Sequence, residues 1–303
     1  MRLVSYSKGE KESIGVELTE GVLDLPSAAA HFGIEHRVHG YSFPIAMIDL
    51  LRWPDGIATV TGLLYTYKRT PSDERPQILQ KDELRLLAPI TRPGKIIGLG
   101  LNYRDHAEET GADVPEFPPI FAKFSSSVSN PNDEIPIPRV TRKLDWEIEL
   151  GVVIGRICKE VSVNEALKYV AGYTIVNDVS ARDLQKDNGQ WTHGKSLDGL
   201  CPMGPCIVTA DELGAASDLK LQTRINGVIK QDSSTSHLLH GVPQVVSYLS
   251  GSFTLEPGDV ISTGTPSGVG FVRDPPEFLQ DGDEMELYVE GIGYLRNRIV
   301  ATR

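Results

Sequence analysis

The chain has 303 residues, of which 40% are hydrophobic and 23% are charged, so it carries enough apolar material for the core of a globular protein. Its formal net charge of −11 is spread along the sequence, which argues against nucleic acid or an anionic membrane surface as the main partner. No apolar run approaches the roughly 18 residues that a membrane span needs.

The cysteines and the N-terminus favour a reducing compartment. Cys158, Cys201 and Cys206 are too few for a disulfide framework, and we interpret them as packing residues rather than zinc ligands. The first residues carry several charged side chains and lack the apolar core of a signal peptide. We therefore predict a cytoplasmic location and leave a mitochondrial one open.

The first section of the chain predicts a small α+β domain. Residues 2–25 alternate like a β-meander. Proline and glycine then gather around Pro89 and Pro93, which is typical of a domain boundary. We predict an N-terminal domain over residues 1–87 and a second domain over residues 88–303.

A strand and a polar helical turn open the second domain. Residues 95–102 have the composition of a buried strand. His106 and Glu109 are three residues apart, so one helical turn would place them on the same face. A carboxylate beside an imidazole orients the ring and raises its basicity, which is half of a general-base device. The alternative is a surface pair without a role. The proline-rich residues 115–138 predict a long loop.

An acidic strand follows at residues 145–154, where the side chains alternate with the period of a β-strand. Apolar side chains fall on one face, and Glu147 and Glu149 fall together on the other, about 7 Å apart along the strand. Left unpaired inside the protein, the two carboxylates would repel each other and cost several kcal/mol in desolvation. A hard divalent cation removes both penalties because it takes oxygen ligands. The alternative is a strand with a solvated acidic face.

Polar side chains also follow the next predicted strand, residues 172–176. Asn177 and Asp178 stand directly after this strand, and Arg182 and Gln185 come shortly after them. The glycine-punctuated stretch beyond them carries a single cation, Lys195. Near carboxylates, such a lysine would neutralise charge or hydrogen-bond a substrate. A solvated loop lysine is the alternative.

The remaining sequence is rich in predicted strands. Asn226-Gly227 inside an alternating stretch predicts a hairpin, and residues 283–300 predict another. Residues 264–270 form a glycine-rich loop whose backbone N–H groups, together with the Thr265 hydroxyl, could approach a small anion. Strands outnumber helices without regular βα alternation, so we predict a β-rich α+β fold.

Together these segments resemble the fumarylacetoacetate hydrolase family, specifically its shorter members, from about residue 95 to residue 300. The resemblance implies a distorted β-roll or β-sandwich with few helices, and a homodimer. It rests on segments that occur in the family's order. These are Gly100-Leu101-Asn102-Tyr103 with His106 and Glu109, Asp145 to Gly151, Asn177-Asp178 with Ser180 to Asp183, Gly194-Lys195, Cys201 to Pro205, and Gly264-Thr265-Pro266.

The resemblance also implies roles for individual residues. The implied ligands of a divalent metal, Mg²⁺ or Mn²⁺ with Ca²⁺ as a further option, are Glu147, Glu149 and Asp178. The implied catalytic residues are His106, Glu109 and Lys195, and the implied substrate contacts are Gln185, Thr265 and Arg182. Leu99 stands where the founding hydrolase has a further metal-site aspartate, which puts hydrolysis of that enzyme's own substrate in doubt.

The implied function is that of a metal-dependent enzyme acting on a small oxo acid or diketo acid. We predict hydrolytic C–C cleavage of a 1,3-diketo acid of the acylpyruvate type, in which His106 takes a proton from the attacking water. Without that water the same site would decarboxylate oxaloacetate, and with proton transfer alone it would tautomerise or isomerise an oxo acid. All three reactions pass through an enolate, so all three stay open. A hypothesis of another class is a non-catalytic scaffold held together by a bound metal.

Overall fold

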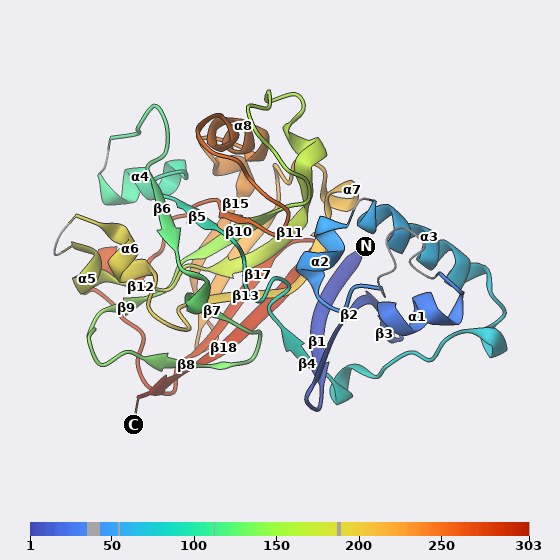
Figure 1. Ribbon diagram of the computed structural model, residues 1–303. Coiled ribbons are helices and arrows are strands. Elements are labelled where there is room, and N and C mark those ends of the chain that lie inside the picture. Colours follow the sequence, from blue (N-terminus) through green and yellow to red (C-terminus); the bar gives the residue numbers. More distant parts are fainter. Residues whose placement is uncertain (35–42, 54, 112, 187–188, 303) are drawn as a thin grey trace.

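Two sheets build the fold, as a computed structural model of the chain shows (Figure 1). The structure describes residues 1–34, 43–53, 55–111, 113–186 and 189–302. Within these ranges the larger sheet has 11 strands and the smaller one has 5, while β9 and β12 form a separate pair. This strand-rich arrangement confirms the predicted α+β class.

The larger sheet runs in the order β3-β2-β1-β13-β11-β10-β16-β5-β6, with β4 beside β1 and β7 beside β13. Two of its central strands, β10 and β11, are buried along their whole length. The bounds of its strands follow. They are β1 Arg2–Lys8, β2 Lys11–Leu18, β3 Gly21–Asp24, β4 Arg85–Leu87, β5 Ile96–Leu99, β6 Ile120–Lys123, β7 Val128–Ser129, β10 Ile148–Ile154, β11 Val170–Asn177, β13 Cys201–Thr209 and β16 Val260–Ser262.

The smaller sheet runs in the order β15-β14-β17-β18-β8. Asn226 and Gly227 turn its first hairpin with φ of 51° and 77°, as a tight two-residue turn requires, so the predicted hairpin is confirmed. The bounds of its strands and of the separate pair follow. They are β8 Glu134–Ile137, β14 Lys220–Ile225, β15 Val228–Ser234, β17 Glu284–Val289, β18 Gly293–Ala301, β9 Leu144–Asp145 and β12 Ser180–Ala181.

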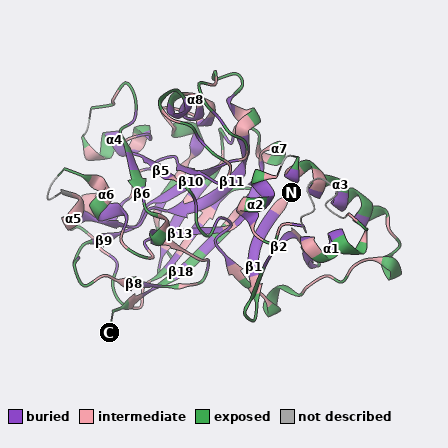
Figure 2. Ribbon diagram, viewed as in Figure 1, coloured by how far each residue is buried: buried purple, intermediate pink, exposed green. Residues whose placement is uncertain are grey.

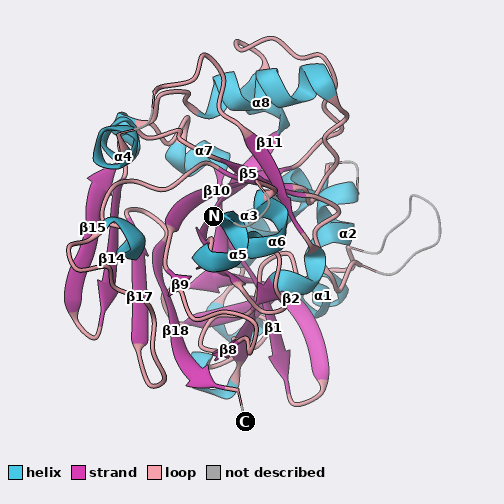
Figure 3. Cartoon of the chain, turned by 90° about the vertical axis from the view of Figure 1, so that its left-hand side faces the viewer, coloured by secondary structure: helices cyan, strands magenta, loops and turns pink. Residues whose placement is uncertain are grey.

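The helices are short and lie around the sheets (Figure 1). Figure 3 shows α5 and α6 side by side, close to β9 and away from α8. No helix among the described residues is long and apolar enough to cross a membrane. Their bounds are α1 Leu25–His31, α2 Met47–Arg52, α3 Gly56–Arg69, α4 Arg104–Thr110, α5 Arg182–Lys186, α6 Trp191–Lys195, α7 Ala210–Leu213 and α8 Val242–Ser252.

The N-terminal section joins the larger sheet through β1. This strand pairs with β2 on one side and with β13 on the other, where Leu3 lies opposite Ile207. The predicted meander is therefore confirmed as β1 to β3, and it extends the same sheet that holds β10 and β11. The division of the chain at residue 87 stays a prediction.

The prediction of a continuous loop over residues 115–138 is wrong. This segment contains β6, which pairs with β5, and β8, which pairs with β18. In β6 the side chains alternate between exposed and buried, with Phe121 and Lys123 on the buried side. Its four residues are too few to stand out between prolines, and as the last strand of the sheet it tolerates such neighbours.

The apolar face of the acidic strand packs into the core between the sheets. Ile148, Leu150 and Val152 belong to one buried cluster with Leu287 and Leu295 of the smaller sheet. Figure 2 shows β10 and β11 mostly in the colour of buried residues. The expected strand over residues 145–154 is divided, because β9 ends at Asp145 and β10 begins at Ile148. The three cysteines are free and buried, as expected for packing residues.

The close approach of β11 to β13 generates a stability prediction. A Cβ on Gly172 would lie 2.2 Å from the Val208 carbonyl oxygen, so Gly172→Ala must push the two strands apart. We expect this overpacking to lower the free energy of unfolding by about 1–3 kcal/mol. Gly251→Ala in α8 is the control, because nothing lies within 4 Å of its added Cβ and a helical alanine gains up to about 1 kcal/mol. Equal urea midpoints for the two variants would contradict the prediction.

Candidate metal and active site

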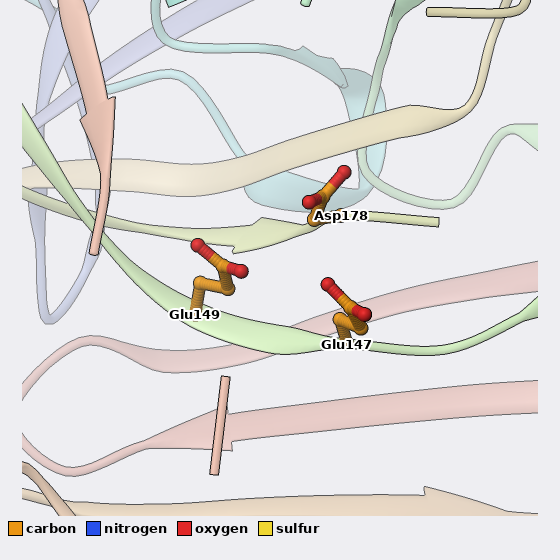
Figure 4. Close-up of side chains that lie close together, drawn as sticks. All are labelled: Glu147, Glu149 and Asp178. Carbon is orange, nitrogen blue, oxygen red and sulfur yellow. The ribbon is translucent and has the colours of Figure 1, made fainter. Parts of the chain in front are cut away.

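Three buried carboxylates converge where β10 begins and β11 ends, two central strands of the larger sheet (Figure 4). Oxygen atoms of Glu147, Glu149 and Asp178 all lie within 4.8 Å of one another. Glu149 lies on β10, and Glu147 lies just before it. Asp178 follows β11, whose register places Asn177 opposite Ile148. The backbone N–H of Asp178 also donates to the Glu147 carbonyl at 2.9 Å. Pairing of these two strands therefore brings the three predicted ligands together.

Two cations compensate part of this negative charge. Lys195 Nζ lies 2.6 Å from Glu147 Oε2 and 2.7 Å from Asp178 Oδ2. Arg182 Nη2 lies 2.6 Å from Glu147 Oε1. Glu149 makes no ion pair within the described part of the chain, although it accepts a hydrogen bond from the Gly264 N–H at 2.8 Å. Glu147 is thus paired with two cations. Of the two glutamates that the sequence places on one strand face, only Glu149 is buried without an ion pair.

The two glutamates consequently titrate in opposite directions. Burial by itself raises the pKa of Glu147, but the positive charges of Arg182 and Lys195 outweigh burial and lower the pKa to about 2. Burial, reinforced by the charges of Asp178 and Glu147, raises the pKa of Glu149 well above its usual value. The cluster therefore has one carboxylate whose charge the surrounding protein does not balance.

The unbalanced negative charge of the cluster and its oxygen donor atoms suit a divalent cation. A hard cation such as Mg²⁺, Mn²⁺ or Ca²⁺ takes carboxylate oxygens. The cation would also supply the neighbouring positive charge that is needed to balance the Glu149 carboxylate. The residues present therefore fit the metal that the resemblance implied, without distinguishing among these ions.

The predicted dyad lies on α4, and its carboxylate is anchored to the glycine-rich loop. His106 Nδ1 lies 3.4 Å from Glu109 Oε2. Both oxygens of Glu109 accept the Gly268 N–H, at 2.9 and 3.1 Å. Gly268 has a φ of +101°, which a residue with a side chain rarely adopts. The loop thus orients the carboxylate, and the carboxylate is positioned to orient the imidazole.

The glycine-rich loop binds carboxylates that belong to the protein itself. Besides the bonds from Gly264 to Glu149 and from Gly268 to Glu109, the Gly270 N–H donates to Asp145 Oδ1 at 2.7 Å. The Thr265 hydroxyl donates to a backbone carbonyl and accepts from an amide. Three of the backbone N–H groups expected to bind a small anion are therefore bonded to carboxylates of the protein itself.

A cavity of about 360 Å³ collects most of the predicted site residues. Phe121 forms part of its wall, and Lys195 Nζ lies 5.1 Å from the centre of that ring. Of the predicted residues, Glu109 and Asp178 are not in its lining. Those that line it are His106, Glu147, Glu149, Arg182, Gln185, Lys195 and Thr265.

Three residues of the site were not singled out from the sequence. Lys123 on β6 is bonded to Asp178 at 2.7 Å. Asp145 accepts from Arg182 Nε at 2.8 Å and so fixes the guanidinium beside Glu147. Gln231 on β15 joins the Ile148 N–H to the Thr265 hydroxyl. In the sequence, the only local signal for Lys123 is that it is a single cation within the otherwise apolar residues 120–124.

Comparison with known proteins gives consistent results. The model of the fumarylacetoacetate (FAA) hydrolase C-terminal family matches residues 95–300. The chain is 44% identical over 305 residues to "Oxaloacetate tautomerase Fahd2a, mitochondrial" of Rattus norvegicus, an alignment that covers 99% of this chain and 92% of that protein.

Two solved structures match along the whole of both chains. One is a fumarylacetoacetate hydrolase from Exiguobacterium antarcticum, with a TM-score of 0.82 and 35% identity. The other is a 5-carboxymethyl-2-hydroxymuconate delta-isomerase from Mycobacterium smegmatis, with a TM-score of 0.73 and 36% identity. Similar chains thus include proteins named as hydrolase, isomerase and tautomerase.

The unequal surroundings of the two glutamates generate a paired prediction. Glu149→Gln removes an unbalanced buried charge, so we expect stability without metal to hold or rise. Glu147→Gln removes one of the two carboxylate partners of Arg182 and of Lys195, which keep Asp145 and Asp178 respectively, so we expect a loss of about 3–5 kcal/mol. Chemical denaturation in the presence of a chelator measures both values. Equal losses in the two variants would contradict the assignment of the uncompensated charge to Glu149.

Both substitutions should also weaken metal binding, since each removes a charged oxygen ligand. We expect Mg²⁺ affinity to fall by at least the roughly 10–100-fold that loss of a ligand's supporting hydrogen bond costs. Titration calorimetry with Mg²⁺ measures it. Unchanged affinity in folded Glu149→Gln would rule out this carboxylate as a ligand.

Proposed function

This chain belongs to the fumarylacetoacetate hydrolase family, and from that membership we propose that it catalyses keto–enol tautomerisation of a small 2-oxo acid such as oxaloacetate, assisted by a divalent cation. The observation that carries the proposal is that a three-carboxylate cluster, a lysine and a histidine–glutamate dyad all contribute side chains to one cavity, which Glu147, Glu149, Lys195 and His106 line. A purely structural ion would need the carboxylates but neither the dyad nor the lysine. The family is one of enzymes, which favours catalysis over a scaffold role.

The reaction requires proton transfer at carbon 3 of the substrate and stabilisation of charge on the carbon 2 oxygen. His106, oriented by Glu109, is the group we assign to the proton at carbon 3. The electron pair of the broken C–H bond then forms the C2–C3 double bond, and the carbonyl oxygen becomes an oxyanion. Return of a proton to that oxygen completes the enol, so no water enters or leaves.

Lys195 is suited to stabilise the oxyanion. Burial lowers the pKa of this lysine, but the charges of Asp178 and Glu147 outweigh burial and leave the pKa raised. Its ammonium group therefore stays protonated and can donate to the developing charge. A hard divalent cation, when bound to the three carboxylates, would supply Lewis acidity toward the 2-oxo group.

Arg182 and Gln185 provide donors near the substrate. The Arg182 guanidinium donates to Gln185 Oε1 at 3.1 Å, which orients the amide and leaves its nitrogen as the donating end. The guanidinium is itself balanced by Asp145 and Glu147. We assign to Arg182 and Gln185 the recognition of a carboxylate group of the substrate. Thr265 lines the same cavity, and we assign its hydroxyl as a third substrate contact, one that accepts a hydrogen bond because its own proton is bonded to the Ile148 carbonyl.

Hydrolytic C–C cleavage was the reaction predicted first, and the comparisons give better support to the oxaloacetate alternative. The rat relative is named as an oxaloacetate tautomerase, and one structural neighbour is named as an isomerase. Cleavage needs an additional water between His106 and a carbonyl, whereas tautomerisation uses the side chains described above. Decarboxylation of oxaloacetate remains the other alternative at this site.

The remaining assignments follow the same membership. We propose Mg²⁺ or Mn²⁺ as the working ion, with Ca²⁺ as a further option, because these ions share the ligand preference of the cluster. The homodimer stays a prediction. The name of the rat relative includes a mitochondrial location, so we propose the mitochondrion as the alternative to the cytoplasm.

The proposed activity can be measured directly. Enol oxaloacetate absorbs in the ultraviolet, so we expect the protein with Mg²⁺ to speed its conversion to the keto form. Addition of a chelator should abolish the effect, and excess Mg²⁺ should restore it. Pyruvate release from acylpyruvates is followed in parallel. Acylpyruvate cleavage without any oxaloacetate interconversion would refute tautomerisation and restore the hydrolase prediction.

The dyad generates a further expected outcome. His106→Ala should lower the tautomerisation rate by about 10²–10⁴-fold, because it removes the general base. Mg²⁺ affinity should stay within a factor of two. His31→Ala is the control, because this exposed histidine lies on α1 and bonds only a backbone carbonyl in the interactions described. A full rate in His106→Ala would transfer the proton-transfer role to Lys195.

A further inference from the structure

Lys123 occupies a position that is unusual for a lysine. Its side chain is 0% exposed, as is that of Asp178. Burying an ammonium group costs several kcal/mol unless ion pairs and hydrogen bonds compensate it. The structure provides that compensation at the metal ligand Asp178, although Lys123 itself does not line the cavity.

The ammonium group of Lys123 has an acceptor for each of its three N–H bonds. It donates to Asp178 Oδ1 at 2.7 Å and to the Leu200 carbonyl at 3.1 Å. Its third acceptor is the carbonyl of Lys195. A lysine ammonium has three donors in all, so none is left for a substrate. The arrangement therefore argues against a direct part in substrate binding.

These bonds divide the two oxygens of Asp178 between two lysines. Lys123 takes Oδ1, and Lys195 takes Oδ2 at 2.7 Å. The carboxylate is thereby held in one orientation, with Oδ2 directed toward Lys195 and Glu147. Because Oδ2 keeps a second lone pair beside its bond to Lys195, a carboxylate held in this way can present that oxygen to a metal without first reorienting.

The same ammonium group holds the backbone that carries the catalytic lysine. Lys195 is the last residue of α6, where helix carbonyls lack partners within the helix. Lys123 bonds the carbonyl of that residue and the carbonyl of Leu200 beyond it. One side chain on β6 thus connects the ligand after β11 with the segment after α6.

We propose that Lys123 is a positioning residue, which orients Asp178 toward the metal and fixes the backbone that carries Lys195. The proposal rests on the proposed metal-assisted function. It differs from the roles assigned above, because Lys123 acts through these two residues. A merely structural lysine would affect stability alone, whereas a positioning lysine must also affect metal affinity and turnover.

The test compares Lys123→Met with Lys95→Met. Methionine approximates the length of the lysine chain but removes its charge and donors. Lys95 is the matched control, because it bonds the buried carboxylate of Asp259 beside the same sheet, outside the site. Titration calorimetry with Mg²⁺ alone measures affinity, and oxaloacetate tautomerisation at saturating Mg²⁺ gives kcat and KM separately.

We expect Lys123→Met to weaken Mg²⁺ binding by about 10–100-fold, the usual effect of losing a partner that supports a metal ligand. At saturating Mg²⁺ we expect kcat to fall more than KM changes, because Lys195 is displaced from the reacting oxygen. Lys95→Met should keep its Mg²⁺ affinity within a factor of two. A folded Lys123→Met protein with a lower melting temperature but normal Mg²⁺ affinity and kcat would overturn the proposal.

Lys123→Arg decides the question if the methionine variant does not fold. Arginine keeps the charge, but its planar fork cannot place donors on the same three oxygens. Mg²⁺ affinity should still fall, and a value within a factor of two of the unmodified protein would overturn the proposal. Failure of the unmodified protein to act on oxaloacetate would refute the proposed function, while the Mg²⁺ titrations would still test Lys123.

Discussion

The structure depends on the balance of charge around three carboxylates inside the larger sheet. Glu147, Glu149 and Asp178 would repel one another in a medium where water cannot screen them. Arg182 and Lys195 neutralise part of that charge from the cavity side, and Lys123 neutralises part of it from the interior. The short elements β6, α5 and α6 carry these three cations.

The smaller sheet supports the same centre through uncharged contacts. Gln231 on β15 accepts hydrogen bonds from the Ile148 N–H and the Thr223 hydroxyl, and its amide nitrogen donates to Thr265 and to the carbonyl of Pro266. One buried amide thus joins the acidic strand, the glycine-rich loop and the smaller sheet. Because all these groups are paired, it adds rigidity without leaving an unsatisfied polar atom.

A site residue could be predicted from the sequence when the contacts that position it are made by residues nearby in the chain. Alternation along one strand is local, so the shared face of Glu147 and Glu149 could be predicted from the residues. The approach of Asp178 depends on pairing between β10 and β11, and only the family resemblance indicated it. Lys123 was missed because its acceptors lie 55 to 77 residues away in the chain. The meander and the hairpin at Asn226 were predictable because turns are encoded by adjacent residues.

The charged cluster and the histidine are held by different parts of the fold. The charged cluster is embedded in central strands, where a substitution disturbs many partners at once. The histidine lies on α4, a helix of seven residues that is capped by Gly111 and is anchored to the loop through Glu109. Changes in length or composition around this helix can alter which atom receives or loses a proton while the charged cluster stays intact. In this fold the charged cluster and the proposed proton-transfer group can therefore change independently of each other.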